Sequence, residues 1–421
     1  MFITNSGDDT IKNVIFDINL TKHEITMKIF AVCQFYYPEN FTITPLLNEL
    51  VRRGHEVTVL TGRPNAGFGR ILEGYHRLRF EIIDGVKVHR VPIRPRKNGR
   101  ISLILNFFSF FFLARMFALR HRGEYDVVLT MSLSPVISMV PAIDFAKRNK
   151  LPLLEYCVDL WPASVAFTNY VDHESLMYRL LKRWSGRIYR AADRLLVGSP
   201  SYAAYMEQVH RIPSAKIATL VQPALTDRLM TAPIVYEKGH NLVYVGNIGQ
   251  VQLLDELVSA LTDFIDVDLH VHIIGSGSSL PELKDKALRL HVDHMLTWYG
   301  TLPSETAFAY LPNADGLFLP LKEGGYVGKT IPNKMMMYLA SGRPILAALC
   351  GDGRDILEQA GGGIIVTPDH HGIVGGLKKL LSLTEEEKNA LGGRNRAYYE
   401  ANHTLNKIGT DLETYLKDLV N

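Results

Sequence analysis

The sequence has few cysteines and no cysteine pattern. Its 421 residues contain only Cys33, Cys157 and Cys350, which lie far apart in the chain. Zinc sites and disulfide frameworks need closely spaced or paired cysteines, so neither is expected. Two of the three lie in apolar runs that predict buried strands. This usage is typical of a reducing compartment, and we expect a cytoplasmic protein.

The sequence also lacks a strong net charge. Lys and Arg number 46 and Asp and Glu 43, which leaves a net charge of +3. This excess is too small to predict nucleic-acid binding, and no nucleic-acid partner is expected. The chain is instead 47% hydrophobic, which is typical of a globular protein with buried sheets. Its length exceeds what one ordinary core encloses, so two domains are expected.

A secretory signal is missing from the N-terminal segment. Residues 1–26 are polar and show no hydrophobic period, whereas Met27 and Lys28 open the first clear strand. We expect residues 1–26 to be a loose extension, or Met27 to be the true start of the protein.

Short apolar runs alternate with amphipathic stretches through the first half of the chain. A strand is predicted at 28–33, a helix before Gly54 and a second strand at 56–60. Their short connections indicate parallel pairing with a right-handed crossover. Further strands are predicted at 126–131, 153–158 and 194–198. Residues 27–212 are therefore expected to form one Rossmann-like domain.

The same pattern restarts after a proline-bearing stretch at 212–233, which predicts a linker. We expect residues 213–395 to form a second Rossmann-like domain, and 396–421 a terminal helix that packs back on the first domain. Its strands are predicted at 241–245, 270–274, 296–300, 316–320, 344–348 and 363–366. The fold class is thus α/β, with two domains facing a cleft at the carboxyl ends of their strands, where open parallel sheets bind ligands.

One segment, 101–119, is very apolar and aromatic. Asn106 and Arg115 interrupt it, so a membrane-spanning helix is disfavoured. Basic residues flank it on both sides, which is typical of a helix lying in the membrane interface. A buried helix of the domain is the alternative.

Two glycine turns follow strands of the second domain. Gly246, Asn247 and Gly249 follow the strand at 241–245, and Gly275 and Gly277 follow the strand at 270–274. Glycines let backbone N–H groups approach a phosphate, and a following helix adds its positive end. A tight turn without a ligand has the same pattern.

A glycine-rich loop before the helix expected at 335–340 is the next candidate. It carries Glu323, Lys329, Thr330 and Lys334. Fixed cations and amides in such a loop suit a diphosphate, and a solvated loop is the alternative. In the first domain, Asp159 follows a predicted strand and is expected to point into the cleft, unless it is a structural cap.

No metal site is predicted. Asp266 and Asp268 have the form of a metal-binding pair, but they precede a strand rather than end one. His270 and His272 alternate on that strand without a cysteine or carboxylate to complete a ligand set, so structural histidines are expected.

Together these motifs resemble the family-four retaining glycosyltransferases of the GT-B fold. More narrowly, the chain is similar to the fucosamine, colanic-acid and O-antigen transferases. The resemblance extends over nearly everything from Met27 onward. It rests on 54–59 (GHEVTV), 159–162 (DLWP), 244–249 (YVGNIG), 273–277 (IIGSG), 299–303 (YGTLP), 330–334 (TIPNK) and 338–344 (YLASGRP).

The resemblance implies that the second domain binds a nucleotide-sugar donor, expected to be a UDP-sugar carrying an N-acetylated amino sugar. The base is expected near Tyr299, Gly300 and Thr301, and the diphosphate near the first glycine turn and Lys329–Thr330. The donor sugar is expected to face Glu39 and Asp159, the residues implied in catalysis. Such enzymes retain the anomeric configuration and need neither metal nor cofactor. The implied acceptor is a lipid-linked glycan of surface polysaccharide, such as O-antigen or capsule, at the inner face of the cytoplasmic membrane.

The sequence departs from the family pattern at several places. Many members carry two glutamates eight residues apart, the second of which holds the ribose, where this chain has Lys329 and Met337. Glu323 is the candidate replacement. Asn247 and Gln250 stand where the family has an arginine and a lysine. A catalytically weak, transferase-derived scaffold and a nucleotide-sugar epimerase are therefore the alternative functions.

Overall fold

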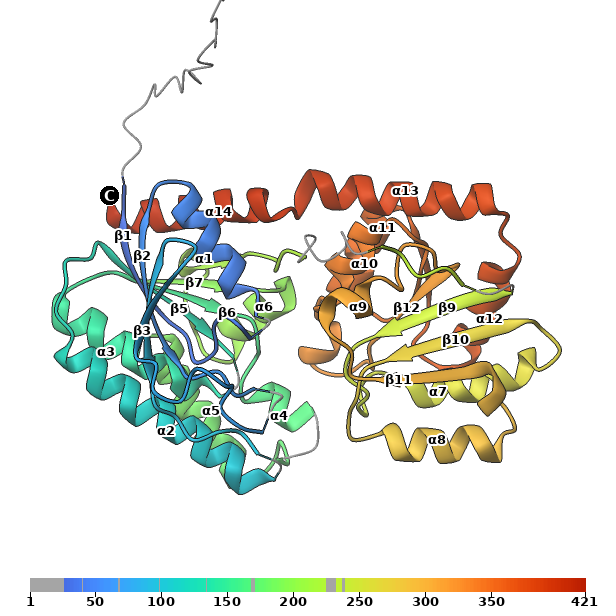
Figure 1. Ribbon diagram of the computed structural model, residues 1–421, viewed down its shortest axis with the longest axis horizontal. Coiled ribbons are helices and arrows are strands. Elements are labelled where there is room, and N and C mark those ends of the chain that lie inside the picture. The colour runs from blue at the N-terminus through green and yellow to red at the C-terminus, as the bar shows by residue number, and fades with distance from the viewer. Residues whose placement is uncertain are drawn as a thin grey trace, which may run out of the picture.

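The structure, a computed structural model, describes residues 26–39, 41–66, 69–97, 99–133, 135–167, 171–224, 232–236 and 239–421. Residues 1–25, nearly all of the predicted extension, lie outside these ranges. Two α/β domains lie side by side, and a terminal helical segment runs along both of them (Figure 1).

The first domain is built on an eight-stranded sheet in the order β3-β4-β2-β1-β5-β6-β7-β8. Its strands pair in parallel except β3 with β4. The strands are β1 (Lys28–Val32), β2 (Glu56–Gly62), β3 (Phe80–Ile83), β4 (Val86–Val91), β5 (Val127–Ser132), β6 (Leu153–Cys157), β7 (Arg194–Val197) and β8 (Ile217–Thr219).

Helices cover both faces of this sheet and form two separate apolar cores. One core lies under α2, α3, α5 and α6, and the other lies under α1 and the last helix of the chain. The helical elements are α1 (Ile43–Arg52), α2 (Arg100–Arg120), η1 (Val136–Met139), α3 (Val140–Asn149), α4 (Ala163–Phe167), α5 (Leu176–Tyr189), α6 (Pro200–Gln208) and η2 (Ser214–Lys216).

The second domain has a parallel six-stranded sheet in the order β11-β10-β9-β12-β13-β14. Its strands are β9 (His240–Val245), β10 (Leu269–Ile274), β11 (Leu296–Gly300), β12 (Gly316–Pro320), β13 (Ile345–Ala348) and β14 (Gly363–Val366). Its helical elements are α7 (Leu254–Ala260), η4 (Leu261–Phe264), α8 (Leu280–Arg289), η5 (Asp293–Met295), α9 (Ser304–Phe308), η6 (Val327–Lys329), α10 (Met335–Ser341), α11 (Asp352–Ala360) and α12 (His370–Leu381).

The terminal helical segment differs from its prediction. It consists of α13 (Glu385–Asn402) and α14 (Leu405–Val420), so it starts before residue 396 and is broken at His403–Thr404. A capping box between Thr384 and Glu387 starts α13, and Thr404 caps α14. The helix α14 packs back on α1 through Ile408, Leu412 and Leu416, as expected.

The strands predicted from apolar runs are present in the structure, but the sequence analysis missed β8 and the β3–β4 hairpin at the two edges of the first sheet. The strand β8 pairs with β7, so the first domain continues past the predicted boundary at residue 212. The β3–β4 hairpin was also missed because β3 is largely solvent-exposed and carries no continuous apolar run.

The apolar segment at 101–119 forms α2, and Asn106 anchors it to the domain. The Asn106 side chain is fully buried; it accepts a hydrogen bond from Gln34 Nε2 at 2.8 Å and donates to Asn65 Oδ1 at 3.0 Å. Phe110, Ala114 and Ala118 continue this buried face onto the domain core. By length and composition alone α2 could cross a membrane, but one of its faces belongs to the core of the first domain.

In each sheet the order in which successive strands are added reverses at an inner strand, which is β1 in the first sheet and β9 in the second. The chain runs outward from β1 to β2 and β4 and then returns to the other side of β1 as β5, and it does the same around β9 with β10 and β12. Open parallel sheets bind ligands at such switch points, beyond the carboxyl ends of the strands. The loops after β1 and β9 are therefore the places to look for a site.

Candidate functional site

The two glycine turns of the second domain interlock at the switch point after β9. The Ile248 N–H donates to Ser276 O at 2.9 Å, and the Ser279 N–H donates to Ile248 O at 3.1 Å. A Cβ on Gly275 would lie 1.9 Å from Gly246 O, and a Cβ on Gly277 would lie 2.1 Å from Ile248 O. Only glycine fits at these two positions, so the sequence motif reflects this close backbone contact.

The helix expected from Leu253 is α7, which begins at Leu254. Its N-terminus therefore follows the Gly246–Gly249 turn rather than lying in it. The Gln252 side chain closes the turn instead, because its Oε1 accepts hydrogen bonds from Gly249 N at 3.0 Å and Asn247 Nδ2 at 3.3 Å. The backbone N–H groups of Gly246, Ile248 and Gly249 are therefore all hydrogen-bonded within the domain, to Ile274 O, Ser276 O and Gln252 Oε1.

Lys334 is half-buried, and its amine is buried directly beneath this turn. The Lys334 amine is 3.7 Å from the centre of the Tyr244 ring, and it makes no hydrogen bond within the described residues. A Cβ on Gly246 would lie 2.9 Å from this amine. Burial lowers the pKa of Lys334 to about 7. A cation whose amine makes no hydrogen bond to the described residues, beside a glycine turn, is suited to receive a phosphate.

The residues expected to hold the base form an aromatic group at the end of β11. Tyr299 packs against Tyr310 and His272, and its hydroxyl lies 3.0 Å from His272 Nδ1. Thr301 donates to Ser276 Oγ at 2.9 Å, and Gly300 O accepts from Gly275 N at 2.8 Å. The expected base site is thus hydrogen-bonded to the second glycine turn.

Both histidines of β10 are hydrogen-bonded to polar side chains of the second domain. His272 Nε2 lies 2.9 Å from Asn241 Oδ1, and burial lowers the pKa of His272 to about 4. His270 pairs with the exposed Asp268 at 3.0 Å. Across the part of the chain that the structure describes, no three His, Cys, Asp or Glu side chains gather as a possible metal set.

The glycine-rich loop after β12 places its residues in different environments. Lys329 is exposed, whereas Thr330 is buried and its hydroxyl donates to Val327 O at 2.9 Å. Glu323 is exposed and adjoins Cys350, whose pKa is raised by burial and by this carboxylate. Met337, at the position of the family's ribose glutamate, is buried in the apolar core of the domain. Met337 therefore cannot accept a hydrogen bond from the ribose as the family's glutamate does.

The first domain presents Glu39 and Asp159 at the carboxyl ends of β1 and β6. Glu39 Oε1 accepts hydrogen bonds from the backbone N–H groups of Asn65 at 2.7 Å and Ala66 at 2.6 Å. Burial nevertheless raises the pKa of Glu39 to about 6. Asp159 is half-buried, and its backbone oxygen accepts from Trp161 N at 3.0 Å.

Side chains that the sequence analysis missed connect the two domains next to these groups. Thr42 at the start of α1 donates to Gln222 Oε1 at 2.6 Å, and Gln222 Nε2 donates to Asn333 Oδ1 at 3.2 Å. Asn333 is the neighbour of Lys334 in sequence. Gln222 therefore links the start of α1, which follows Glu39 in the chain, to the loop that carries Asn333 and Lys334.

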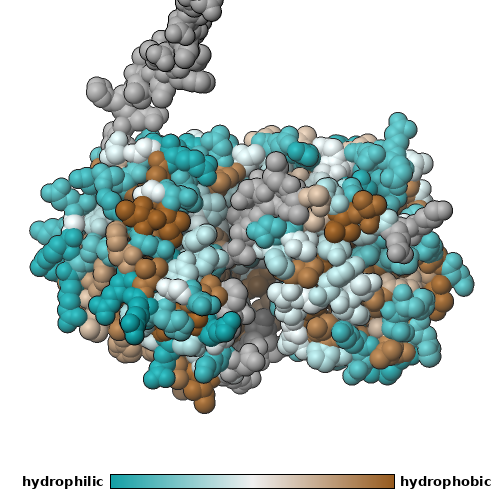
Figure 2. Space-filling view, in the orientation of Figure 1, coloured by the Kyte–Doolittle hydropathy of each residue, from teal (hydrophilic) through white to brown (hydrophobic). Residues whose placement is uncertain are grey.

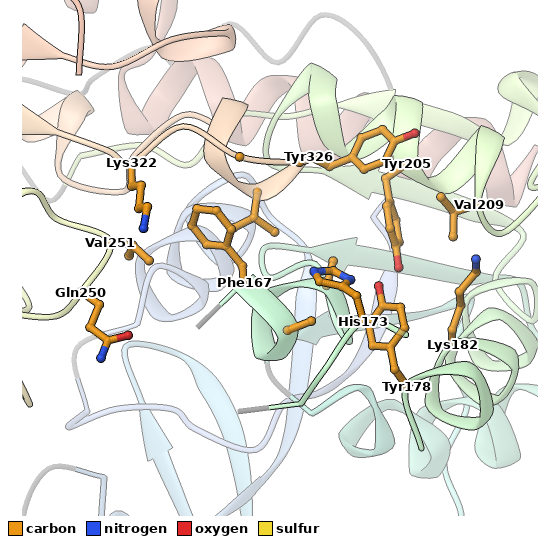
Figure 3. Close-up of a pocket in the computed structure, with 15 residues that line it drawn as sticks. Phe167, His173, Tyr178, Lys182, Tyr205, Val209, Gln250, Val251, Lys322 and Tyr326 are labelled. Atoms are coloured by element: carbon orange, nitrogen blue, oxygen red, sulfur yellow. The ribbon is translucent and has the colours of Figure 1, made fainter. Parts of the chain in front are cut away.

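A cavity of about 560 Å³ also lies between the domains and was missed by the sequence analysis. Figure 3 shows its aromatic side, where Tyr178, His173 and Tyr205 lie together, and its opposite side with Gln250, Val251 and Lys322. Gln250 directly follows the first glycine turn. The cavity is thus next to the expected diphosphate site. The feature of the sequence that could have indicated this cavity is α5, which mixes basic and apolar residues.

The sequence matches two family models, one for each domain. Residues 40–221 match the glycosyl transferase 4-like domain, and residues 239–382 match the glycosyl transferases group 1. The chain is 26% identical over 324 residues to the probable glycosyltransferase WbjE of Pseudomonas aeruginosa. The alignment covers 74% of this chain and 79% of that protein.

Solved structures share the fold at low sequence identity. Sucrose-phosphate synthase from Thermosynechococcus elongatus superposes with a TM-score of 0.70 at 14% identity, over 93% of this chain and 99% of the other. Anabaena HepE superposes with a TM-score of 0.68 at 12% identity, over 93% and 100%. WaaG superposes with a TM-score of 0.64 at 16% identity, over 92% and 99%. From its two family domains, its curated relative and its two-domain architecture, the chain is a hexosyltransferase of the GT-B glycosyltransferases.

Proposed function

We propose that this glycosyltransferase moves a sugar, an N-acetylated amino sugar, from a UDP donor to a lipid-linked glycan of a surface polysaccharide. The transfer retains the anomeric configuration and needs no metal ion. The observation that carries the donor part is the buried Lys334 amine, which lies against the Gly246 turn without a hydrogen-bond partner among the described residues.

The chemistry follows from these positions. The bond between the anomeric carbon and the diphosphate oxygen breaks, and a bond from the acceptor oxygen to the same carbon forms. The proton of the acceptor hydroxyl passes to the leaving diphosphate oxygen on the same face. The Lys334 amine meets the charge that develops on the diphosphate, and a preorganised donor of this kind contributes about 3–4 kcal/mol.

Proteins of similar sequence or fold support the donor and acceptor classes. HepE was solved in complex with UDP, and WaaG is involved in lipopolysaccharide biosynthesis. WbjE is named as a probable glycosyltransferase. We place this chain in the same type of polysaccharide biosynthesis, in the fucosamine, colanic-acid and O-antigen branch.

The test is a transfer assay with UDP-N-acetylhexosamines, UDP-glucose and a GDP-sugar, each with and without a polyprenyl-diphosphate-linked acceptor and with EDTA present. We expect UDP release that depends on the acceptor, and a product whose anomeric configuration, read by NMR, matches the donor. Conversion of the donor without acceptor would identify an epimerase. A folded protein that binds no UDP would favour the scaffold alternative.

The helix α2 supports the membrane part of the proposal. Its outer side exposes Ile101, Ile104, Leu105, Phe108, Phe112, Met116 and Leu119. Figure 2 shows hydrophobic residues at the lower end of the first domain, where α2 lies in Figure 1. An exposed apolar stripe on a helix anchored through Asn106 suits a helix that lies in the interface of an anionic membrane. We therefore propose a peripheral position on the inner face of the cytoplasmic membrane.

Polar substitutions on this stripe are expected to reduce membrane binding. Deletion of α2 is a poor test because its other face is part of the domain core. The triple variant Ile104→Ser, Phe108→Ser, Phe112→Ser should instead lower binding to phosphatidylglycerol vesicles at least about tenfold, because partly buried apolar side chains each contribute about 1 kcal/mol or more. Vesicle co-sedimentation is the measurement.

A matched triple variant controls for exposure and composition. Val235, Ile265 and Leu288 are exposed apolar residues of the second domain, and their substitution by serine should leave vesicle binding unchanged. Equal binding of wild type and the α2 variant would contradict the membrane proposal.

A further inference from the structure

Asn106 is a polar residue on the buried face of an otherwise apolar helix. Phe110, Ala114 and Ala118 follow it in α2 at intervals of one helical turn, and all four side chains are fully buried. An apolar residue would pack at this position without the cost of removing an amide from water. The reason for an asparagine here therefore lies in the hydrogen bonds that it makes.

The Asn106 side chain joins three loops that follow strands of the first sheet. Its Oδ1 accepts from Gln34 Nε2 at 2.8 Å, in the loop after β1. Its Nδ2 donates to Asn65 Oδ1 at 3.0 Å, in the loop after β2, and to Arg94 O at 2.5 Å, in the loop after β4. These three strands are neighbours in the sheet. One side chain of α2 thus holds together the loops at their carboxyl ends.

Asn65 connects this contact to Glu39. Its side chain is buried, and it also accepts from Arg96 N at 2.8 Å and donates to Arg63 O at 2.9 Å. The backbone N–H groups of Asn65 and Ala66 both donate to Glu39 Oε1. The hydrogen bonds of the Asn65 side chain therefore set the position of the amides that hold this carboxylate.

The two carboxylate oxygens of Glu39 have different environments. Oε1 is held by two backbone donors, whereas Oε2 is buried and makes no hydrogen bond to the described residues. A buried oxygen without a partner gains free energy from a ligand that donates to it, and a sugar hydroxyl is such a donor. Because Oε1 is fixed, the direction of Oε2 is fixed with it.

We propose that Asn106 is a positioning residue for the reaction: through Asn65 it holds Glu39 Oε1, and it thereby directs Glu39 Oε2 toward a hydroxyl of the donor sugar. This inference rests on the proposed function, which places Glu39 beside that sugar. The helix α2 then has a role on each side, since its inner side supports the Glu39 loop and its outer side is the proposed membrane contact.

Burial and hydrogen bonding act on the charge of Glu39 in opposite directions. Burial raises its pKa to about 6, whereas the N–H groups of Ala66 and Asn65 and the charge of Arg90 on β4 lower it. Cys33, directly after β1, is a further titratable neighbour; burial raises the pKa of its thiol to about 12, so this thiol stays neutral. Displacement of the Asn65 amide should therefore raise the pKa of Glu39.

The test is an NMR titration of the Glu39 carboxyl in protein with isotope-labelled glutamate, with Glu39→Gln to assign the signal. Asn106→Ala removes the contact with Asn65, and we expect the Glu39 midpoint to rise by at least about half a pH unit. Asn106→Leu removes the same hydrogen bonds and keeps water out, so it should shift the midpoint in the same direction. An unchanged midpoint in either folded variant overturns the proposal.

A double-mutant cycle tests the route through Asn65. Asn65→Ala should raise the Glu39 midpoint by at least about half a pH unit. Asn106→Ala should add little to that shift, because both changes break the same contact. Fully additive shifts would show that Asn106 acts on Glu39 by another route, which would overturn the proposal.

Phe110→Leu is the matched control for a merely structural role. Phe110 lies one turn further along the same buried face and belongs to the apolar core of the domain. The substitution loosens the packing of α2 without removing a hydrogen bond, so the Glu39 midpoint should stay at its wild-type value. A shift equal to that of Asn106→Ala would reduce Asn106 to a packing residue and overturn the proposal.

Transfer kinetics separate this inference from the proposed function. In Asn106→Ala the acid limb of the kcat profile should move upward with the Glu39 midpoint, so that kcat falls at least about twofold at pH 6 and recovers by pH 8, with KM for the UDP-sugar little changed. A loss of kcat that is equal at every pH would overturn the positioning role. Wild-type transfer by Glu39→Gln would instead contradict the proposed function, since the carboxyl titration needs no substrate.

Discussion

Lys334→Met is expected to weaken UDP binding at least about 100-fold, because it removes the buried amine beneath the Gly246 turn. The methionine occupies a similar volume beside Tyr244, so the turn itself should persist. Calorimetry with UDP is the measurement, and circular dichroism checks the fold. Lys379→Met, an exposed change in the same domain, should leave UDP affinity unaffected. An unaltered affinity in Lys334→Met would show that the diphosphate binds elsewhere.

The pH dependence of UDP binding gives a second signature of the same lysine. Burial lowers the pKa of Lys334 to about 7 in the free protein, and a bound diphosphate is expected to raise it. UDP binding should therefore take up a proton above pH 7 and weaken as the pH rises toward 9. Titrations in buffers of different ionisation enthalpy measure this uptake, and Lys334→Met should abolish it.

The sign for stability of the free protein is opposite to that of an ordinary ion pair. The unfolded chain holds the lysine proton up to the ordinary lysine pKa of 10.5, whereas the folded chain releases it near 7. The unfolded state binds more protons between these values, so this lysine makes stability rise with pH in that window. Below pH 7 its destabilising effect is complete. Lys334→Met should thus stabilise the free protein most at pH 6–7.

Gly275→Ala is expected to destabilise the second domain by about 3 kcal/mol, because it combines overpacking with backbone strain. The added Cβ would lie 1.9 Å from Gly246 O, and the backbone has a φ of 141°. Since the two glycine turns interlock, UDP binding should be lost together with stability. Denaturant unfolding and UDP titration measure the two effects.

Gly393→Ala is the control for this substitution. Gly393 lies within α13, is exposed, and a Cβ there meets nothing within 4 Å. The change should stabilise the helix by about 0.5–1 kcal/mol and leave UDP binding as in wild type. If Gly275→Ala were as stable as Gly393→Ala, the close contact between the two turns could not be correct.

The edges of elements show where sequence patterns stop being informative. Buried parallel strands such as β5 and β6 are short continuous apolar runs, which single them out. The strand β8 has three residues and is stabilised by pairing with β7 rather than by its own composition. The terminal segment starts early because Thr384 caps it, although Gly392 lies inside the helix. A Cβ on Gly392 would lie 2.0 Å from Gly342 O, so a tertiary contact explains that glycine.

Some features of the candidate site could be predicted from local sequence, and others depend on tertiary contacts. The glycine turns were predictable because glycine at the end of a buried strand has a local reason, the positive φ and close backbone approach of Gly246 and Gly275. The environment of Lys334 was not, because its burial depends on Tyr244 from β9, far away in sequence. Glu39 likewise owes its raised pKa to burial among groups from other loops.

By itself the sequence determined the alternation of strands and helices, the two parallel sheets and the glycine turns, because each of these depends on residues that are neighbours in the chain. Only the tertiary structure decided which charged groups are buried and which side of α5 faces the cavity. Burial and charge at a site depend on the distances between segments from both domains. The cavity that holds Lys182 and Tyr326 exists only where those two domains meet.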